Sequence, residues 1–245
     1  MPKIAIIGGS GLDDPQILQN ATEKNIENKY GRLASPLTIG QIAGVDVMIL
    51  ARHGKTHNVM PTKINFMANI QALKDEGCTH ILATTAVGSL REEIKPGNLV
   101  FPDQFIDFTR HRNLTYFTDQ VEHKPMADPY DPLLRSLLRN TCDELGFEYN
   151  CDKTVITIEG PRFSTRAESH MFRQWGADII NMSTCPEVIL ANELSLPYQT
   201  IAMSTDYDCW KTDEAPVTFE MVMKRMAENA EKVKQLLIKV IPKIQ

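Results

Sequence analysis

The sequence predicts a single α/β domain built around a largely parallel β-sheet. Short apolar runs of strand length alternate with amphipathic segments of helix length along the 245 residues. We find no internal repeat, low-complexity stretch or linker-like segment that would divide the chain. Hydrophobic residues make up 42% of the sequence, which is enough for one large core. We therefore expect one domain that covers residues 1–245.

Seven apolar runs have the length and composition of buried strands. They are residues 4–7, 45–50, 80–84, 99–101, 154–158, 178–181 and 199–203. Helical spacing predicts helices over 64–74, 132–145, 164–175 and 186–194, and a long helix that ends near Val240. Asp131 before Pro132 and Thr218 before the long helix are candidate N-caps, and Gly146 is a candidate stop. Residues 108–131 lack either pattern, and an irregular segment of that length is usually functional or at an interface.

Composition excludes several classes of protein. The formal net charge is -5, from 26 basic and 31 acidic residues, and no basic stripe suited to nucleic acid is present. The five cysteines contain no CxxC pair, which argues against a zinc ribbon or a disulfide framework and favours reduced thiols in the cytoplasm. No apolar run approaches the length that spans a membrane, and residues 1–8 are too short for a signal peptide.

Three cofactor-like motifs fail on inspection. The glycine-rich turn after the first run has Asp14 where a dinucleotide fingerprint needs glycine. A P-loop ending at Gly54-Lys55-Thr56 would need glycine in place of Ile49. His53 and His57 have the spacing of a zinc helix, but the glutamate of that motif is missing. We expect no metal and no nicotinamide cofactor.

Ligands of open α/β sheets bind beyond the carboxyl ends of the strands, and several polar groups follow the predicted strands. Backbone N–H groups around Ser10, the planar fork of Arg52, the Thr85 hydroxyl and the N–H of Ala86 together suit a phosphate. Each residue also has an ordinary explanation: a turn, a surface ion pair or a strand end. Their joint placement favours phosphate.

Asp206 and Asp208 follow the last predicted strand. In an extended chain both carboxyls would face one side, and their proximity would separate their pKa values. One could then donate a proton to a leaving heterocycle while the other accepts from its exocyclic amine; a solvated turn is the alternative. Phe163 could stack on a base or belong to the core, and Met182 has the same two explanations.

Six motifs in the same order resemble the trimeric purine nucleoside phosphorylase family over nearly the whole chain. They are GGSGL (8–12), ARHG (51–54), TTAVGSLREE (84–93), TIEGPRFSTRAE (157–168), NMS with Pro186-Glu187 (181–187) and STDYDCW (204–210). The resemblance implies a single α/β domain with a twisted mixed β-sheet flanked by helices. It also implies a homotrimer with active sites near the subunit interfaces, no cofactor, and phosphate as co-substrate.

The implied activity is phosphorolysis of S-methyl-5′-thioadenosine to adenine and 5-methylthioribose 1-phosphate. The family pattern implies that Asp206 and Asp208 are catalytic, and it assigns further residues to binding. Phosphate would contact Ser10, Arg52, His53, Thr85, Ala86 and Ser183; the nucleoside would contact Phe163, Ser164, Asn181, Met182, Thr205, Asp206, Asp208, Phe219 and Val222, with His123 from a neighbouring subunit.

Two positions indicate a 6-aminopurine. Branches of the family that act on 6-oxopurines have glutamate at Ser164 and asparagine at Asp206, so this chain resembles the adenine branch. A methylthioinosine or inosine phosphorylase is the nearest alternative. A non-catalytic nucleoside-binding module is another, although it would not need Arg52 and His53. Because Phe219 is bulky and the chain ends at Gln245, where some relatives continue, we expect looser selection at the 5′ position, with some activity on adenosine.

Overall fold

The computed structural model of the chain describes residues 2–8, 17–213 and 218–245. Within them, nine strands form one sheet in the order β10-β9-β8-β11-β7-β1-β6-β5-β2. The strands of this sheet are β1 (Lys3–Gly8), β2 (Gln19–Lys24), β5 (Leu37–Ile42), β6 (Val45–Ala51), β7 (His80–Ser89), β8 (Leu99–Phe108), β9 (Tyr149–Ile158), β10 (Ile179–Asn181) and β11 (Tyr198–Asp206). A separate hairpin joins β3 (Glu27–Asn28) to β4 (Gly31–Arg32).

The sheet is mixed. β1 pairs in parallel with β6 and β7, β7 with β11, and β9 with both β8 and β10. The pairs β8–β11, β5–β6, β2–β5 and β7–β10 are antiparallel. The β7–β10 pairing closes a ring of five strands, β7, β11, β8, β9 and β10, at one end of the sheet. The predicted α/β class with a mixed sheet is confirmed.

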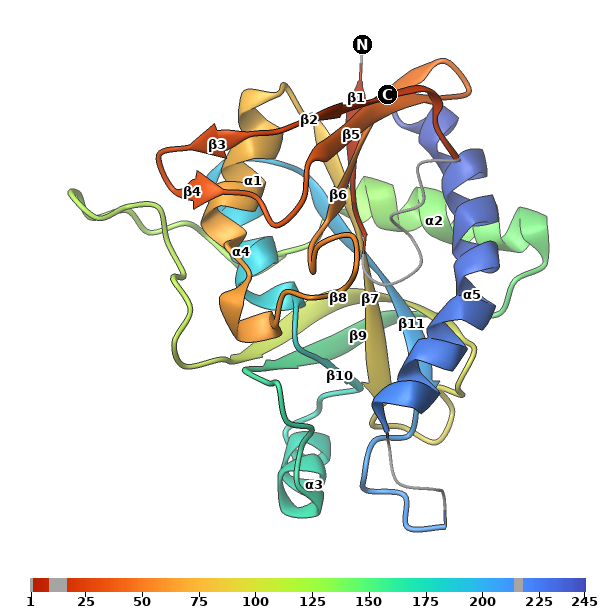
Figure 1. Ribbon diagram of the computed structural model, residues 1–245. Coiled ribbons are helices and arrows are strands. Elements are labelled where there is room, and N and C mark those ends of the chain that lie inside the picture. Colours follow the sequence, from red (N-terminus) through yellow and green to blue (C-terminus); the bar gives the residue numbers. More distant parts are fainter. Residues whose placement is uncertain (1, 9–16, 214–217) are drawn as a thin grey trace.

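Helices cover both faces of the sheet (Figure 1). In that view α1 (Phe66–Asp75) and α4 (Thr184–Glu193) lie on the left, and α2 (Pro132–Leu145) and α5 (Phe219–Val240) lie on the right. α3 (Arg166–Gln174) projects below the ring, and short 3₁₀ turns form η2 (Pro61–Lys63) and η3 (Ile241–Lys243). None of the helices in the described residues is long and apolar enough to span a membrane.

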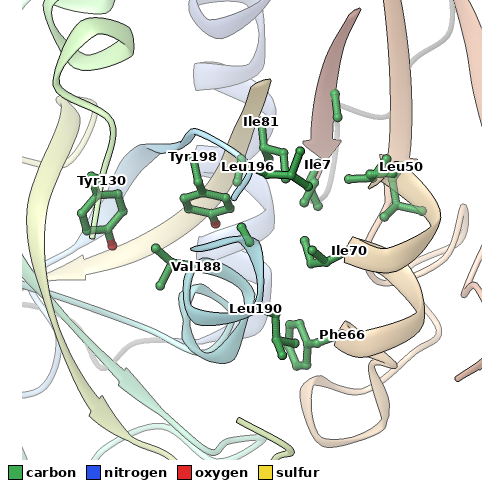
Figure 2. Close-up of a cluster of buried hydrophobic side chains, with 14 of the residues drawn as sticks. Ile7, Leu50, Phe66, Ile70, Ile81, Tyr130, Val188, Leu190, Leu196 and Tyr198 are labelled. Carbon is green, nitrogen blue, oxygen red and sulfur yellow. The ribbon is translucent and has the colours of Figure 1, made fainter. Parts of the chain in front are cut away.

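Strand alternation divides the core between these two layers, because successive side chains point to opposite faces. Ala5 and Ile7 face α1 and α4, whereas Ile4 and Ile6 face α2 and α5. Figure 2 shows the first cluster, in which Phe66 and Ile70 of α1 meet Val188 and Leu190 of α4, next to Ile7, Leu50 and Ile81 of the strands. A third cluster buries Phe172 of α3 against Ile156 and Ile180.

The helix boundaries follow the capping residues. The Asp131 carboxylate accepts from Leu134 N at 2.8 Å, and Gly146 ends α2 at a φ of 68°, a left-handed conformation that suits glycine. Thr218 caps α5 through Met221 N, as predicted. Thr165 and Glu168 form a reciprocal capping box at the start of α3.

Several strands differ from the prediction. β7, β8 and β11 continue beyond the apolar runs to Ser89, Phe108 and Asp206. Thr85 and Asp206 therefore lie on strands rather than after them, because the ladder continues past the apolar run that marks the strand in sequence. The exposed β2, the two-residue β3 and β4, and the six-residue β5 lack a long apolar run, and sequence analysis missed them. Residues 109–131 contain no helix or strand, as expected.

Candidate active site

A cavity of about 350 Å³ lies where β6, β7, β10 and β11 end, with the first turns of α5 against it. Fourteen of the residues predicted from sequence line it. They are Arg52, His53, Thr85, Ala86, Phe163, Ser164, Asn181, Met182, Ser183, Thr205, Asp206, Asp208, Phe219 and Val222. Five of the six motifs, which lie far apart in the sequence, therefore meet in one site.

Two predicted residues are not placed in this cavity. Ser10 lies outside the described residues. His123 is exposed on the 109–131 loop, and it is not among the residues of the protomer that line the cavity. The structure thus brings fourteen of the predicted residues together within one chain, and the role of His123 stays a prediction.

The two carboxyls lie side by side, but the backbone reaches this arrangement through a turn. Asp206 ends β11, whereas Asp208 has a left-handed φ of 50°, so the expectation of an extended chain through both residues is wrong. The turn lets Asp208 N donate to Asp206 Oδ1 at 2.8 Å. Ser164 Oγ lies 2.8 Å from both carboxylate oxygens of Asp208 and fixes the orientation of that group.

Asp206 is suited to hold a proton to higher pH than an ordinary carboxyl. Its side chain is buried, with 8% of the residue exposed. Burial raises the pKa of its carboxyl from 3.8 to about 6, and the charge of Asp208 acts in the same direction. Hydrogen bonds from Thr205 Oγ1 and Asp208 N oppose this rise without cancelling it. A carboxyl in this state can act as a general acid.

Arg52 is held by a buried carboxylate that sequence analysis missed. Its Nε and Nη2 donate to the two oxygens of Glu187, both at 2.7 Å, and Nη1 donates to Thr84 O at 3.0 Å. Tyr198 Oη also donates to Glu187, at 2.8 Å. The Nε–Nη2 edge of the fork therefore faces Glu187. Three of the five N–H groups of Arg52 donate to these protein acceptors, which leaves one on Nη1 and one on Nη2 for an anion. The only signal in the sequence was Glu187 within the Pro186-Glu187 motif.

His53 is a neutral imidazole with a defined tautomer. Its Nδ1 lies 2.9 Å from Val59 O, and because a carbonyl can only accept, Nδ1 carries the hydrogen. Burial, and next the charge of Arg52, lower the pKa of His53 to about 4. The ring also stacks on His57, with 4.4 Å between ring centroids.

Hydroxyl groups converge beside Arg52. Thr85 Oγ1 and Ser183 Oγ are 2.9 Å apart, although β7 and the residue before α4 are distant in sequence. Asn181 Nδ2 donates to Thr184 Oγ1 at 2.6 Å and to Thr85 Oγ1 at 3.3 Å. Asn181 thus positions these hydroxyls, and the cluster offers donors to an oxyanion.

The opposite part of the cavity is apolar. Phe163, Met182, Phe219 and Val222 line it as predicted. The structure adds residues that sequence analysis did not single out: Met60, Pro61, Met223 and Met226 among others. Methionines at helical spacing in α5 have the same pattern as core residues, so no sequence signal separated them from the core.

The site combines a cluster of hydroxyls beside Arg52, a buried carboxyl of raised pKa beside a second carboxyl, and an apolar end. Among the described residues, no group of three or more histidine, cysteine, aspartate or glutamate side chains is arranged to hold a metal ion. The arrangement can bind a phosphate next to a polar ring and protonate that ring.

Comparison with known proteins gives a consistent result. The phosphorylase superfamily matches residues 3–242. The chain is 53% identical to S-methyl-5′-thioadenosine phosphorylase of Danio rerio, over 99% of this chain and 89% of the relative. The Drosophila melanogaster protein of the same name is 49% identical, over 99% and 86% of the two chains.

Solved structures agree with the sequence relatives. Methylthioadenosine phosphorylase from Schistosoma mansoni in complex with adenine is 36% identical and has a TM-score of 0.95, over 99% of this chain and 91% of that chain. A methylthioadenosine phosphorylase from an antarctic soil metagenomic library is 41% identical, with a TM-score of 0.94 over 99% and 86%. The resemblance seen in the sequence motifs is confirmed, and the chain belongs to the phosphorylase superfamily.

Proposed function

We propose that this protein catalyses phosphorolysis of S-methyl-5′-thioadenosine, giving adenine and 5-methylthioribose 1-phosphate. The observation that carries the proposal is Asp206, a buried acid whose pKa of about 6 lets it hold a proton beside a second carboxyl in the cavity. The relatives that are half identical over the full chain have this activity in their names. The protein is thus a pentosyltransferase that uses phosphate as acceptor.

The two carboxyls suit adenine. An adenine ring has an acceptor at N7 and a donor at N6. Asp206 donates to N7 while it is protonated, and Asp208, held by Ser164, accepts from N6. A 6-oxopurine would place an acceptor against Asp208, and such a mismatch is costly because buried polar groups are left unpaired.

Phosphate is the nucleophile. Arg52, His53, Thr85, Ala86 and Ser183 line the polar part of the cavity where it would bind, and Ser10 is assigned there by its motif. The bond from the anomeric carbon to N9 breaks, its electron pair goes to adenine, and a phosphate oxygen bonds to that carbon. The transition state has oxocarbenium character, as in glycoside hydrolysis, so the bound phosphate stabilises the developing charge.

The apolar end accommodates the 5′ substituent. Phe219, Val222 and the neighbouring methionines offer a thioether an apolar, polarisable surface. Adenosine is a second substrate of this proposal. A Schistosoma mansoni relative is named adenosine/methylthioadenosine phosphorylase, and a mutant of that relative is known in complex with methylthioadenosine.

The assembly and its setting complete the proposal. We propose a homotrimer in which His123 contributes to a neighbour's cavity, supported by the exposure of its loop and of Leu114 and Val121 on it. No metal or organic cofactor takes part. We also propose a cytoplasmic location, where the five free cysteines stay reduced. The proposed role of the reaction is in methionine and purine salvage.

The test is purine release from S-methyl-5′-thioadenosine, with and without phosphate and after treatment with EDTA. Methylthioinosine and adenosine serve as comparison substrates. We expect adenine release that requires phosphate, survives EDTA, and is much faster than hypoxanthine release from methylthioinosine. Release without phosphate would indicate a hydrolase, and a preference for methylthioinosine would overturn the roles of Ser164 and Asp206.

A further inference from the structure

The Thr205 hydroxyl lies between two acceptors. Its Oγ1 is 2.6 Å from Asp206 Oδ2 and 3.2 Å from Val87 O, and only 4% of the residue is exposed. A hydroxyl carries one hydrogen, so Thr205 cannot donate to both atoms at once. Val87 O is a carbonyl and can only accept.

Counting protons distinguishes two arrangements. When Asp206 is protonated, Thr205 donates to Val87 O, and the Oδ2 hydrogen is donated to Thr205 Oγ1 before adenine binds and to N7 once adenine is bound. When Asp206 is ionised, Thr205 turns to donate to Oδ2 and releases Val87 O. In both cases Asp206 Oδ1 accepts from Asp208 N, so Oδ2 is the oxygen that gains and loses the proton.

We propose that Thr205 is a positioning residue whose hydroxyl donates to Val87 O while Asp206 holds its proton and turns to Asp206 Oδ2 as that proton passes to adenine. The inference rests on the proposed function. The O–H bond at Oδ2 breaks as the bond between hydrogen and N7 forms, the glycosidic electron pair goes to the purine, and a phosphate oxygen bonds to the anomeric carbon. The new carboxylate then receives the Thr205 hydrogen bond.

This rotation of the Thr205 hydroxyl stabilises the carboxylate that Asp206 becomes when it releases its proton inside the cavity. A carboxylate in this cavity is poorly solvated, so the proton is hard to release, and the charge of Asp208 adds to the difficulty. Donation from Thr205 lowers the pKa of Asp206. The neighbouring strand β7 presents Gly88 to Asp206, and α5 contributes apolar side chains to this cavity. The other titratable groups of the cavity are Arg52, His53 and His57, and Asp208 is the charge that acts on Asp206.

The test compares pH profiles of kcat for Thr205→Val and Thr205→Ser, at saturating substrate and phosphate. Valine keeps the shape of threonine and removes the hydroxyl. We expect the alkaline limb of Thr205→Val to move to higher pH by about 0.5–1 unit, and its plateau to fall roughly tenfold, because a hydrogen bond to a charged group is lost. Thr205→Ser restores the wild-type limb. Phosphate titrates in the same range, but identically in every variant.

Thr200→Val is the matched control, since Thr200 is equally buried on the same strand and is not among the groups that shift Asp206. It should leave the alkaline limb in place. A lower plateau in Thr205→Val without movement of the limb, or a limb at lower pH, would overturn the proposal. If valine impairs folding, the pH profile of kcat is measured for Thr205→Ala, and the same shift of the alkaline limb is expected. Absence of phosphate-dependent adenine release in the wild type would instead reject the proposed function before any variant is measured.

Discussion

At the scale of single residues, the cavity depends on the ionic form that burial imposes on each side chain. Asp206 holds a proton to about pH 6, and His53 stays neutral with its hydrogen on Nδ1. Arg52 keeps its charge, which Glu187 balances. These forms decide what each group can give a ligand: Asp206 an acid proton, His53 a lone pair at Nε2, and Arg52 its remaining N–H groups.

The acid role of Asp206 predicts the effect of Asp206→Asn. The amide keeps a donor for N7 but cannot transfer a proton, so we expect kcat on S-methyl-5′-thioadenosine to fall by about 10²–10⁴-fold. Steady-state kinetics measures the loss, and circular dichroism checks the fold. The surface change Glu231→Gln is the control and should leave kcat unchanged. Wild-type kinetics in Asp206→Asn would reject the assignment.

The same variant should alter the pH dependence of stability. The folded-state pKa of Asp206 lies above its ordinary value of 3.8, so its contribution is most favourable below that value and is lost as pH rises to about 6. Above pH 6 the buried carboxylate costs up to about 3 kcal/mol. Asparagine stays neutral, so we expect Asp206→Asn to gain stability over the wild type at pH 7.5 but little at pH 4. Urea unfolding at both pH values measures the difference; an equal difference at both would contradict it.

At the scale of elements, helices supply side chains that complete the site at the strand ends. α4 carries Glu187 to Arg52 after β6, and the hydroxyl of Tyr198 on β11 meets the same carboxylate; Figure 2 shows Tyr198 beside α4. α5 covers the apolar part of the cavity with Phe219 and Val222. The polar and apolar ends of the site are thus built by different helices.

The buried ion pair predicts a large effect of Glu187→Ala on stability. Arg52 is 1% exposed and Glu187 is fully buried, so the variant leaves an uncompensated charge. We expect a loss of about 3–5 kcal/mol in the free energy of unfolding. The double variant Arg52→Met with Glu187→Met should lose much less, because it removes both charges. Equal losses in the single and double variants would show that the pair contributes packing rather than charge balance.

At the scale of the whole molecule, the ring of β7, β11, β8, β9 and β10 brings distant motifs to one end of the sheet. The 109–131 loop extends from this end and exposes Val121 at 84% and Leu114 at 43%. Apolar side chains on a long surface loop suit a protein interface. The sequence resemblance assigns His123 of this loop to a neighbour's cavity.

The proposed homotrimer predicts a sedimentation mass of about three chains in analytical ultracentrifugation, by the closed symmetry common in homo-oligomers. His123→Ala should raise KM for S-methyl-5′-thioadenosine more than KM for phosphate, since the resemblance places it at the 5′ group. His170→Ala, at an exposed position of α3, is the control. A monomer with full activity, or a change confined to the phosphate KM, would contradict this arrangement.

The sequence by itself determined the α/β class, the helix boundaries marked by Asp131, Gly146 and Thr218, and fourteen residues of the cavity. These features depend on local periodicity, capping chemistry and motifs, and each of those signals comes from residues that are close together in sequence. Tertiary structure alone decided how far β7 and β11 extend and which carboxylate holds Arg52. Glu187 lies 135 residues from Arg52, so their pairing exists only once strand order and register are set.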